Sequence, residues 1–386
     1  MISFLLAIIY LCFISLGLPD SLLGAAWPTI YQDFNVPVSY AGIISITICL
    51  STIISSLLSD KLTKRFTPGL VTAVSIVTTA VALLGFSISS SFWMLLLFAV
   101  PYGLGAGGVD ACLNNYVALH YKSNHMSWLH AMWGLGATIS PYIMGYALTG
   151  GKGWNQGYLI VSLIQFLLCF VVFLSLPKWK RHTESEVVVN SKTLSIKEIL
   201  VIPGALTCFI TFFCYCALEQ TAMLWASSYL VQNNHLQEET AAMLASMFCI
   251  GITLGRIING FLTYKINDKN LIRLGMSVLA VAIVLLFIPT TVTTISGFVL
   301  IGLGCAPIYP SIIHSTPELF GSENSQAMIG IQMACAYSGV LLMPPLFGLI
   351  ANHITISLLP IYLLFILMIM VIMHEVTSEL TKRKEA

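Results

Sequence analysis

Apolar residues occur along this chain in long runs that short polar segments interrupt. Each run holds about 20 residues or more, enough for an α-helix to cross the hydrocarbon core of a bilayer. The pattern predicts an all-α integral membrane protein with twelve transmembrane helices. We place them at about 3–32, 38–59, 69–90, 93–121, 125–149, 157–177, 199–231, 239–264, 270–289, 292–317, 323–351 and 354–375.

The composition excludes a soluble protein of this size. Of the 386 residues, 57% are hydrophobic and only 9% are charged. So few charges could not cover the surface of a soluble domain. The first basic residue is Lys61, so the N-terminal run lacks the basic start of a signal peptide, and we expect it to be the first membrane helix. The ten cysteines show no spacing typical of zinc or disulfides.

The basic residues predict the orientation and the domain organisation. All lysines and arginines except Lys152 and Arg256 follow the even-numbered runs, which places both termini in the cytoplasm. The polar stretch 178–198 follows the sixth run. We therefore expect an N-terminal six-helix bundle at 1–177, a cytoplasmic linker at 178–198, and a C-terminal six-helix bundle with a short cytoplasmic tail at 199–386.

The two halves repeat each other. Gly103-Leu104-Gly105 recurs 199 residues later as Gly302-Leu303-Gly304, and the same offset maps Asp20 onto Glu219. The fifth and eleventh runs carry His130 and Gln332 at similar places. Two six-helix repeats around a central site are the architecture of many secondary transporters.

Three acids lie inside apolar runs: Asp20, Asp110 and Glu219. A carboxylate there costs free energy, and such residues commonly mark ion or substrate pathways. A carboxylate whose exposure changes as a cavity opens to either side can bind and release a proton. We therefore expect proton coupling at Asp20 and Asp110, and a substrate contact at Glu219. The alternative for each is a hydrogen bond that only packs helices.

Polar and aromatic residues near these acids are candidates for substrate binding. Asn114 shares a helix face with Asp110, and its amide suits a sugar hydroxyl. His130 could pair with Asp110 or could equally be structural, and Trp133 could stack on a sugar ring or simply pack. The full candidate set for substrate binding is Asn114, Asn115, His130, Trp133, Glu219, Trp225 and Gln332.

Other chemistries find no support in the sequence. The GxGxxG pattern at Gly103–Gly108 lies inside an apolar run with no strand before it, so close helix packing explains it better than a dinucleotide. There is no Walker motif and no basic patch for nucleic acid. We expect a monomer that is not an enzyme, needs no cofactor or metal, and has the lipid bilayer, protons and a small-molecule substrate as its partners.

The loop after the second run carries a family resemblance. It reads Ser56-Leu57-Leu58-Ser59-Asp60-Lys61-Leu62-Thr63-Lys64-Arg65, which resembles the G-x-L-A-D-R-x-G-R-R signature of the major facilitator superfamily. A weaker copy runs from Gly260 to Lys269. The resemblance implies that Asp60, Lys61, Lys64 and Arg65 form a cytoplasmic gate, where we also expect Arg256 to pair.

Three further segments look like the fucose/glucose–proton symporter branch of that superfamily: Gly17–Pro28, Val109–Val117 and Leu129–Ala137. In that branch, acids of the first and fourth helices serve proton coupling and sugar binding, and Asp20 and Asp110 occupy the matching positions. The resemblance implies a proton-coupled importer of a sugar or related polar metabolite in the cell membrane. A proton-driven drug or metabolite exporter and a membrane sensor or scaffold that does not transport are the alternatives.

Overall fold

The structure is a computed structural model, and it describes residues 4–37, 40–149, 151, 153–179, 195–236, 241, 244, 247–288 and 290–382. Most of the expected linker, including Lys180, Arg181 and Lys192, lies outside these residues, as do Arg383 and Lys384 of the tail. The described residues form helices and no strands, which confirms the all-α prediction. Ten of their helical segments are long and apolar enough to cross a membrane.

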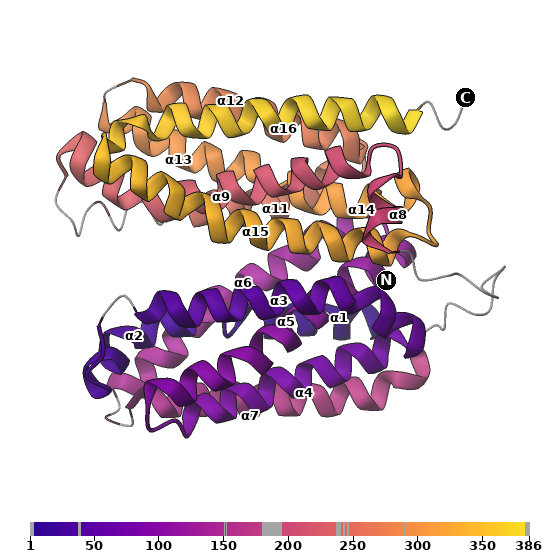
Figure 1. Ribbon diagram of the computed structural model, residues 1–386, viewed down its shortest axis with the longest axis vertical. Coiled ribbons are helices and arrows are strands. Elements are labelled where there is room, and N and C mark those ends of the chain that lie inside the picture. Colours follow the sequence, from indigo (N-terminus) through magenta and orange to yellow (C-terminus); the bar gives the residue numbers. More distant parts are fainter. Residues whose placement is uncertain are drawn as a thin grey trace. The chain divides into compact units, whose positions relative to one another are not determined.

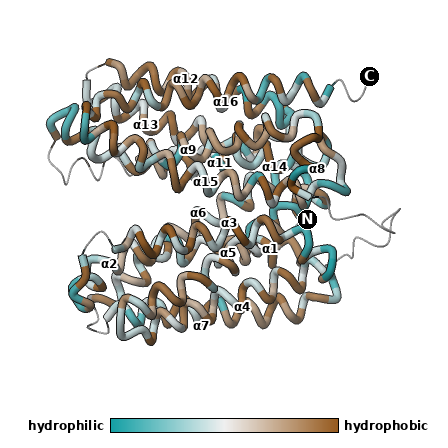
Figure 2. Tube along the Cα trace, viewed as in Figure 1, coloured by the Kyte–Doolittle hydropathy of each residue, from teal (hydrophilic) through white to brown (hydrophobic). Residues whose placement is uncertain are grey.

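The chain divides into two compact units, each a bundle of helices (Figure 1). Unit 1 comprises Met1–Tyr116 and Leu129–Thr193; unit 2 comprises Val117–Trp128 and Leu194–Ala386. The segment Val117–Trp128 joins the fourth and fifth apolar runs, yet it packs in unit 2. Figure 2 shows hydrophobic residues along the helices and hydrophilic residues gathered toward helix ends.

The helices of the first sequence half follow the predicted runs. They are α1 (Phe4–Gly17), α2 (Leu22–Asp33), α3 (Tyr40–Arg65), α4 (Pro68–Ser87), α5 (Phe92–His120), α6 (Ser123–Thr149) and α7 (Gly153–Ser175), followed by the 3-10 turn η1 (Leu176–Lys178).

The second half contains α8 (Ile196–Leu200), α9 (Ala205–Asn234), α11 (Met247–Leu262), α12 (Asp268–Leu286), α13 (Thr291–Cys305), α14 (Ile308–Phe320) and α15 (Ser325–His353). The 3-10 turn η2 (Ile356–Leu358) and α16 (Leu359–Lys382) complete it.

Two of the predicted runs are each broken into two helices. The first run breaks between α1 and α2, and the tenth breaks between α13 and α14. Pro19 explains the first break, because a proline has no N–H to bond the carbonyl four residues earlier and its ring crowds that carbonyl. The freed carbonyl of Ser15 accepts a hydrogen bond from the side-chain amide of Gln165 on α7 at 2.9 Å. Pro307 lies at the second break.

The repeated glycines bring three helices together in each unit. In unit 1, a Cβ atom at Gly103 would meet the Ile48 carbonyl of α3, and one at Gly105 would lie 2.6 Å from the Ser75 carbonyl of α4. In unit 2, a Cβ at Gly302 would meet the Phe248 carbonyl of α11. A Cβ at Gly304 would lie 2.9 Å from the Gly275 carbonyl of α12. The internal repeat therefore encodes the same close packing of α5 and α13 against two neighbours.

We predict that Gly302→Ala lowers the stability of the bundle by about 1–3 kcal/mol, because the added methyl group must displace the backbone of α11. Gly145→Ala is the matched control, since a Cβ at this glycine of α6 meets nothing within 4 Å. Thermal unfolding of both purified variants in detergent checks the prediction. Equal melting temperatures would show that the close contact at Gly302 does not limit stability.

Candidate functional site

The break between α1 and α2 presents the carboxylate of Asp20 to two donors. Tyr102 of α5 donates its hydroxyl to Oδ1 at 2.9 Å, and Trp133 of α6 donates its indole N–H to Oδ2 at 2.8 Å. Both carboxylate oxygens are thus hydrogen-bonded, yet Asp20 keeps exposed surface. A carboxylate with these two features can contact water or a solute while its hydrogen bonds keep it in place.

Asp20 has this position because of the amide that fills the break. Gln165 donates to the Ser15 carbonyl and accepts from the Thr79 hydroxyl at 2.7 Å, and it is 1% exposed. Gln165 therefore supplies the hydrogen bond that the Ser15 carbonyl loses because Pro19 has no N–H. Neither Gln165 nor Tyr102 is among the site residues that the sequence predicts. The available signal was a single amide, Gln165, inside the sixth apolar run.

A second polar network lies deeper in unit 1. Asn114 donates its side-chain amide to Asp110 Oδ1 at 2.8 Å, and its Oδ1 faces His130 Nε2 at 3.1 Å. Because the amide oxygen can only accept, Nε2 of His130 is the donor. The ring of Phe13 packs edge-on against His130, with centroids 5.4 Å apart. All three polar residues are at most 5% exposed, so the structure brings together the predicted Asp110, Asn114 and His130 in one buried chain.

The two networks of unit 1 share the same pair of helices. Tyr102 precedes Asp110 by eight residues on α5, which is about 12 Å of helix rise. Trp133 follows His130 by three residues on α6. Asp20 and Asp110 are therefore not within direct hydrogen-bonding reach. Asn115, the neighbour of Asn114, is also buried at 6% exposure.

In unit 2 the third acid has a basic partner. Glu219 of α9 and Arg256 of α11 form an ion pair with 3.7 Å between Oε1 and Nη2. Both are buried, at 9% and 4% exposure. Tyr215 precedes Glu219 by one turn, and its ring lies T-shaped to that of Tyr309, which follows the break before α14. We expected Arg256 to pair at the gate; the structure gives it a partner from the candidate substrate set, because Arg256 and Glu219 come from helices of the same bundle.

The other two candidates of unit 2 have hydrogen bonds inside the bundle. Gln332 is fully buried and donates to the Thr316 hydroxyl at 3.0 Å and to the Cys208 sulfur at 3.2 Å. Trp225 donates its indole N–H to the Pro344 carbonyl at 3.0 Å. Both side chains thereby join α9 to other helices, and this arrangement fits packing better than contact with a solute.

The expected gate residues of the loop motif lie at the C-terminal end of α3 in unit 1. Asp60 is 5% exposed and pairs with Lys64 one turn later at 3.0 Å, while Lys61, Lys64 and Arg65 are exposed. The guanidinium of Arg65 lies over the ring of Phe66 at 5.6 Å.

Polar contacts hold the segment Val117–Trp128 in unit 2. Asp268 accepts from the Ser123 hydroxyl through Oδ1 and faces His314 Nδ1 through Oδ2 at 2.6 Å. The other ring nitrogen of His314 lies 3.0 Å from the Tyr121 carbonyl. Asn259 donates to the Ser127 hydroxyl at 2.7 Å. Asp268, which lies in the weaker copy of the loop motif, thus holds a segment of the first sequence half in unit 2.

The fold and these intramembrane polar networks define a class: a helical membrane carrier built from two related bundles. The sequence profile of the Major Facilitator Superfamily matches residues 9–232 and 207–385. The chain belongs to this superfamily, as the loop motif predicted. It is therefore a multi-pass membrane transporter and not an enzyme.

Among curated proteins, "Bypass of stop codon protein 6" of Saccharomyces cerevisiae is 23% identical over 90% of this chain and 77% of its own length. The "Glucose/mannose transporter GlcP" of Bacillus subtilis is 22% identical over 78% of this chain and 77% of its own length. Among solved structures, the transporter FucP in its outward conformation matches with a TM-score of 0.79 at 14% identity. That match covers 97% of this chain and 98% of FucP, and it shows a shared fold.

We predict that Glu219→Gln destabilises unit 2 by about 3–5 kcal/mol, because it leaves the buried Arg256 guanidinium without its carboxylate. The double variant Glu219→Gln with Arg256→Gln should lose less stability than the single variant, since it removes both charges. Melting temperatures of purified Glu219→Gln, Arg256→Gln and the double variant check this. A double variant that is less stable by the sum of both single losses would contradict coupling between the two side chains.

Proposed function

We propose that this chain is a proton-coupled importer of a sugar or a related polar metabolite that works by alternating access. The observation that carries the proposal is the Asp20 carboxylate, which is exposed at a helix break and fixed by Tyr102 and Trp133. Broken helices form the substrate and ion sites of many secondary transporters. The similarity to the glucose/mannose transporter GlcP supports the sugar as substrate class, and the similarity to the fucose:proton symporter FucP supports both the sugar and the proton.

The two acids of unit 1 have different surroundings, and we propose different tasks for them. Asp20 has exposed surface, so it is the acid that exchanges a proton with water as access alternates. Asp110 is 4% exposed and hydrogen-bonded to Asn114. It is therefore the acid that responds to the alternation of access indirectly, through the buried hydrogen-bond network. His130, at the far end of that network, is a second group that can accept a proton, and Asn114 connects it to Asp110 by hydrogen bonds.

We propose candidate solute contacts within each unit taken by itself. Trp133 offers a ring beside Asp20, and the amide of Asn115 suits a sugar hydroxyl, whereas the amide of Asn114 bonds Asp110 and His130. Glu219, held by Arg256, provides the contact from unit 2. We now place Arg256 at this site rather than at the gate, and we give Trp225 and Gln332 packing roles because their polar atoms bond within unit 2.

We propose further that both termini are cytoplasmic and that the protein lies in the cell membrane. The distribution of basic residues supports this orientation. The gate residues of unit 1 would then be Asp60, Lys61, Lys64 and Arg65, while Asp268 holds the segment Val117–Trp128 within unit 2.

Transport into proteoliposomes under an imposed proton gradient tests the function. Accumulation of a sugar together with proton uptake supports the proposal. A solute that leaves in exchange for protons would identify an exporter instead, and no flux of any solute together with retained binding of a partner protein would favour a sensor or scaffold.

We predict that Asp20→Asn abolishes accumulation against a gradient but keeps part of the downhill exchange, because the amide still accepts hydrogen bonds but cannot carry a proton. Asp33→Asn is the matched control: Asp33 accepts an indole N–H from Trp154 at 2.8 Å, as Asp20 does from Trp133. Proton-driven uptake and counterflow are measured for both variants. Accumulation that survives in Asp20→Asn would remove Asp20 from the coupling role.

A further inference from the structure

Unit 2 contains a cavity of about 460 Å³. Asp268, which holds the segment Val117–Trp128, is part of its lining, but none of the proposed solute contacts is. The cavity lies among α9, α12, α14 and α16, where α12 begins and α16 ends. Its volume is in the range of cavities that hold small ligands. Cys208 lines it and precedes Glu219 by eleven residues on α9, which is about 16 Å of helix rise. The cavity is therefore separate from the candidate substrate contact.

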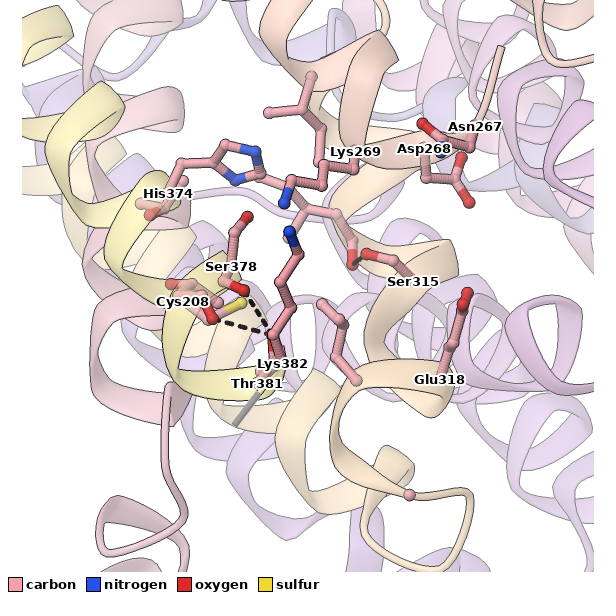
Figure 3. Close-up of a pocket in the computed structure, with 16 residues that line it drawn as sticks. Cys208, Asn267, Asp268, Lys269, Ser315, Glu318, His374, Ser378, Thr381 and Lys382 are labelled. Atoms are coloured by element: carbon pink, nitrogen blue, oxygen red, sulfur yellow. Dashed lines mark hydrogen bonds between the residues drawn. The ribbon is translucent and has the colours of Figure 1, made fainter. Parts of the chain in front are cut away.

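Two lysines reach into the cavity from different helices. Lys269 comes from the first turn of α12, and Lys382 is the last residue of α16. Figure 3 shows their side chains directed toward the same part of the cavity. Two ammonium groups that share one site repel each other. An anion bound between them attracts both, so the net electrostatic energy of the site becomes favourable.

The carboxylates near these lysines already have partners. Glu375 accepts two hydrogen bonds from Arg273, at 2.7 and 2.5 Å. Asp268 uses one oxygen for Ser123 and the other for His314. Within the described part of the chain, neither Lys269 nor Lys382 has a carboxylate oxygen within ion-pair distance. Their positive charge is therefore available to a ligand.

A buried imidazole adds a second, independent sign of a ligand. His374 of α16 lines the cavity and is only 7% exposed. Its Nε2 is buried and has no hydrogen-bond partner among the described residues. Figure 3 shows its ring beside the lysine side chains. Buried polar atoms nearly always have a partner, so this nitrogen requires one that the described residues do not supply.

Two further features favour an anion at this place. Ser378 lies one turn before Lys382 on α16 and presents a hydroxyl to the cavity. The N-terminus of α12, capped by Asn267, also lines the cavity, and the positive end of a helix dipole attracts negative charge. Glu318 is the opposing charge, and Figure 3 places it on the far side of the cavity from His374.

We propose that this cavity is a binding site for a phosphate group, with Lys269 and Lys382 as its cations and His374 and Ser378 as hydrogen-bond donors. Phosphate offers several oxygens that can accept from all four groups at once. The phosphate comes from a soluble phosphorylated metabolite or from the headgroup of an anionic lipid. The site does not depend on which solute the protein transports.

Titration of the purified full-length protein in a neutral detergent with inorganic phosphate tests the site. We expect a saturable rise in melting temperature that sodium chloride at equal ionic strength does not produce. The double variant Lys269→Gln with Lys382→Gln should bind phosphate at least about tenfold more weakly, because it loses two charge-assisted bonds. Glu318→Gln should bind phosphate more tightly, since it removes the opposing charge.

Lys265→Gln is the matched control, because Lys265 is an exposed lysine that does not line the cavity. The double variant Lys269→Arg with Lys382→Arg keeps both charges, so it should retain binding and shows whether the positions tolerate change. Helical circular dichroism confirms that each variant is folded. Equal stabilisation by phosphate and chloride, or equal weakening by Lys265→Gln, would overturn the proposal.

Nanodiscs distinguish the two sources of phosphate. Stabilisation by glucose 6-phosphate in nanodiscs of phosphatidylcholine alone would assign the site to a soluble metabolite. Stabilisation by phosphatidylglycerol nanodiscs over phosphatidylcholine nanodiscs, lost in the double Gln variant, would assign it to a lipid headgroup. Absence of both effects would refute the site.

Discussion

The structure of this protein depends on the cost of leaving polar groups without partners inside a membrane. The break at Pro19 shows how the chain meets this constraint. Pro19 frees the Ser15 carbonyl, and Gln165 from another helix takes the hydrogen bond. The same break lets Asp20 meet Tyr102 and Trp133. The break in this helix thus sets the position of the Asp20 carboxylate, and hydrogen bonds from neighbouring helices keep the carboxylate there.

Close helix packing makes these polar contacts possible. The glycines of α5 and α13 allow their backbones to approach two neighbours in each unit, so short polar side chains can reach across. The Thr52 hydroxyl of α3 reaches the Gly103 carbonyl of α5 in this way, at 3.1 Å. Because the two halves repeat the glycine spacing, unit 2 has the same packing but different polar residues. Its acid, Glu219, is neutralised by Arg256, whereas Asp20 accepts only neutral donors.

This difference in partners gives the two pseudo-equivalent acids different surroundings. A carboxylate bonded to an indole and a phenol can still change its protonation state without leaving a buried charge unpaired. A carboxylate paired with a buried guanidinium is more strongly held in its charged form. Asp20 is therefore better suited to exchange protons, and Glu219 is better suited to a fixed contact.

The sequence by itself determined the helical membrane fold, the repeat and the three intramembrane acids, because run length and the cost of buried charge are local properties. The loop motif at Asp60 also identified the superfamily. Only the tertiary structure decided which side chains meet. It paired Arg256 with Glu219 and brought Tyr102 to Asp20. It also placed His374, whose Nε2 has no hydrogen-bond partner in the described part of the chain, beside two lysines. Such contacts join residues far apart in the chain, and no local pattern specifies how neighbouring helices are rotated against each other.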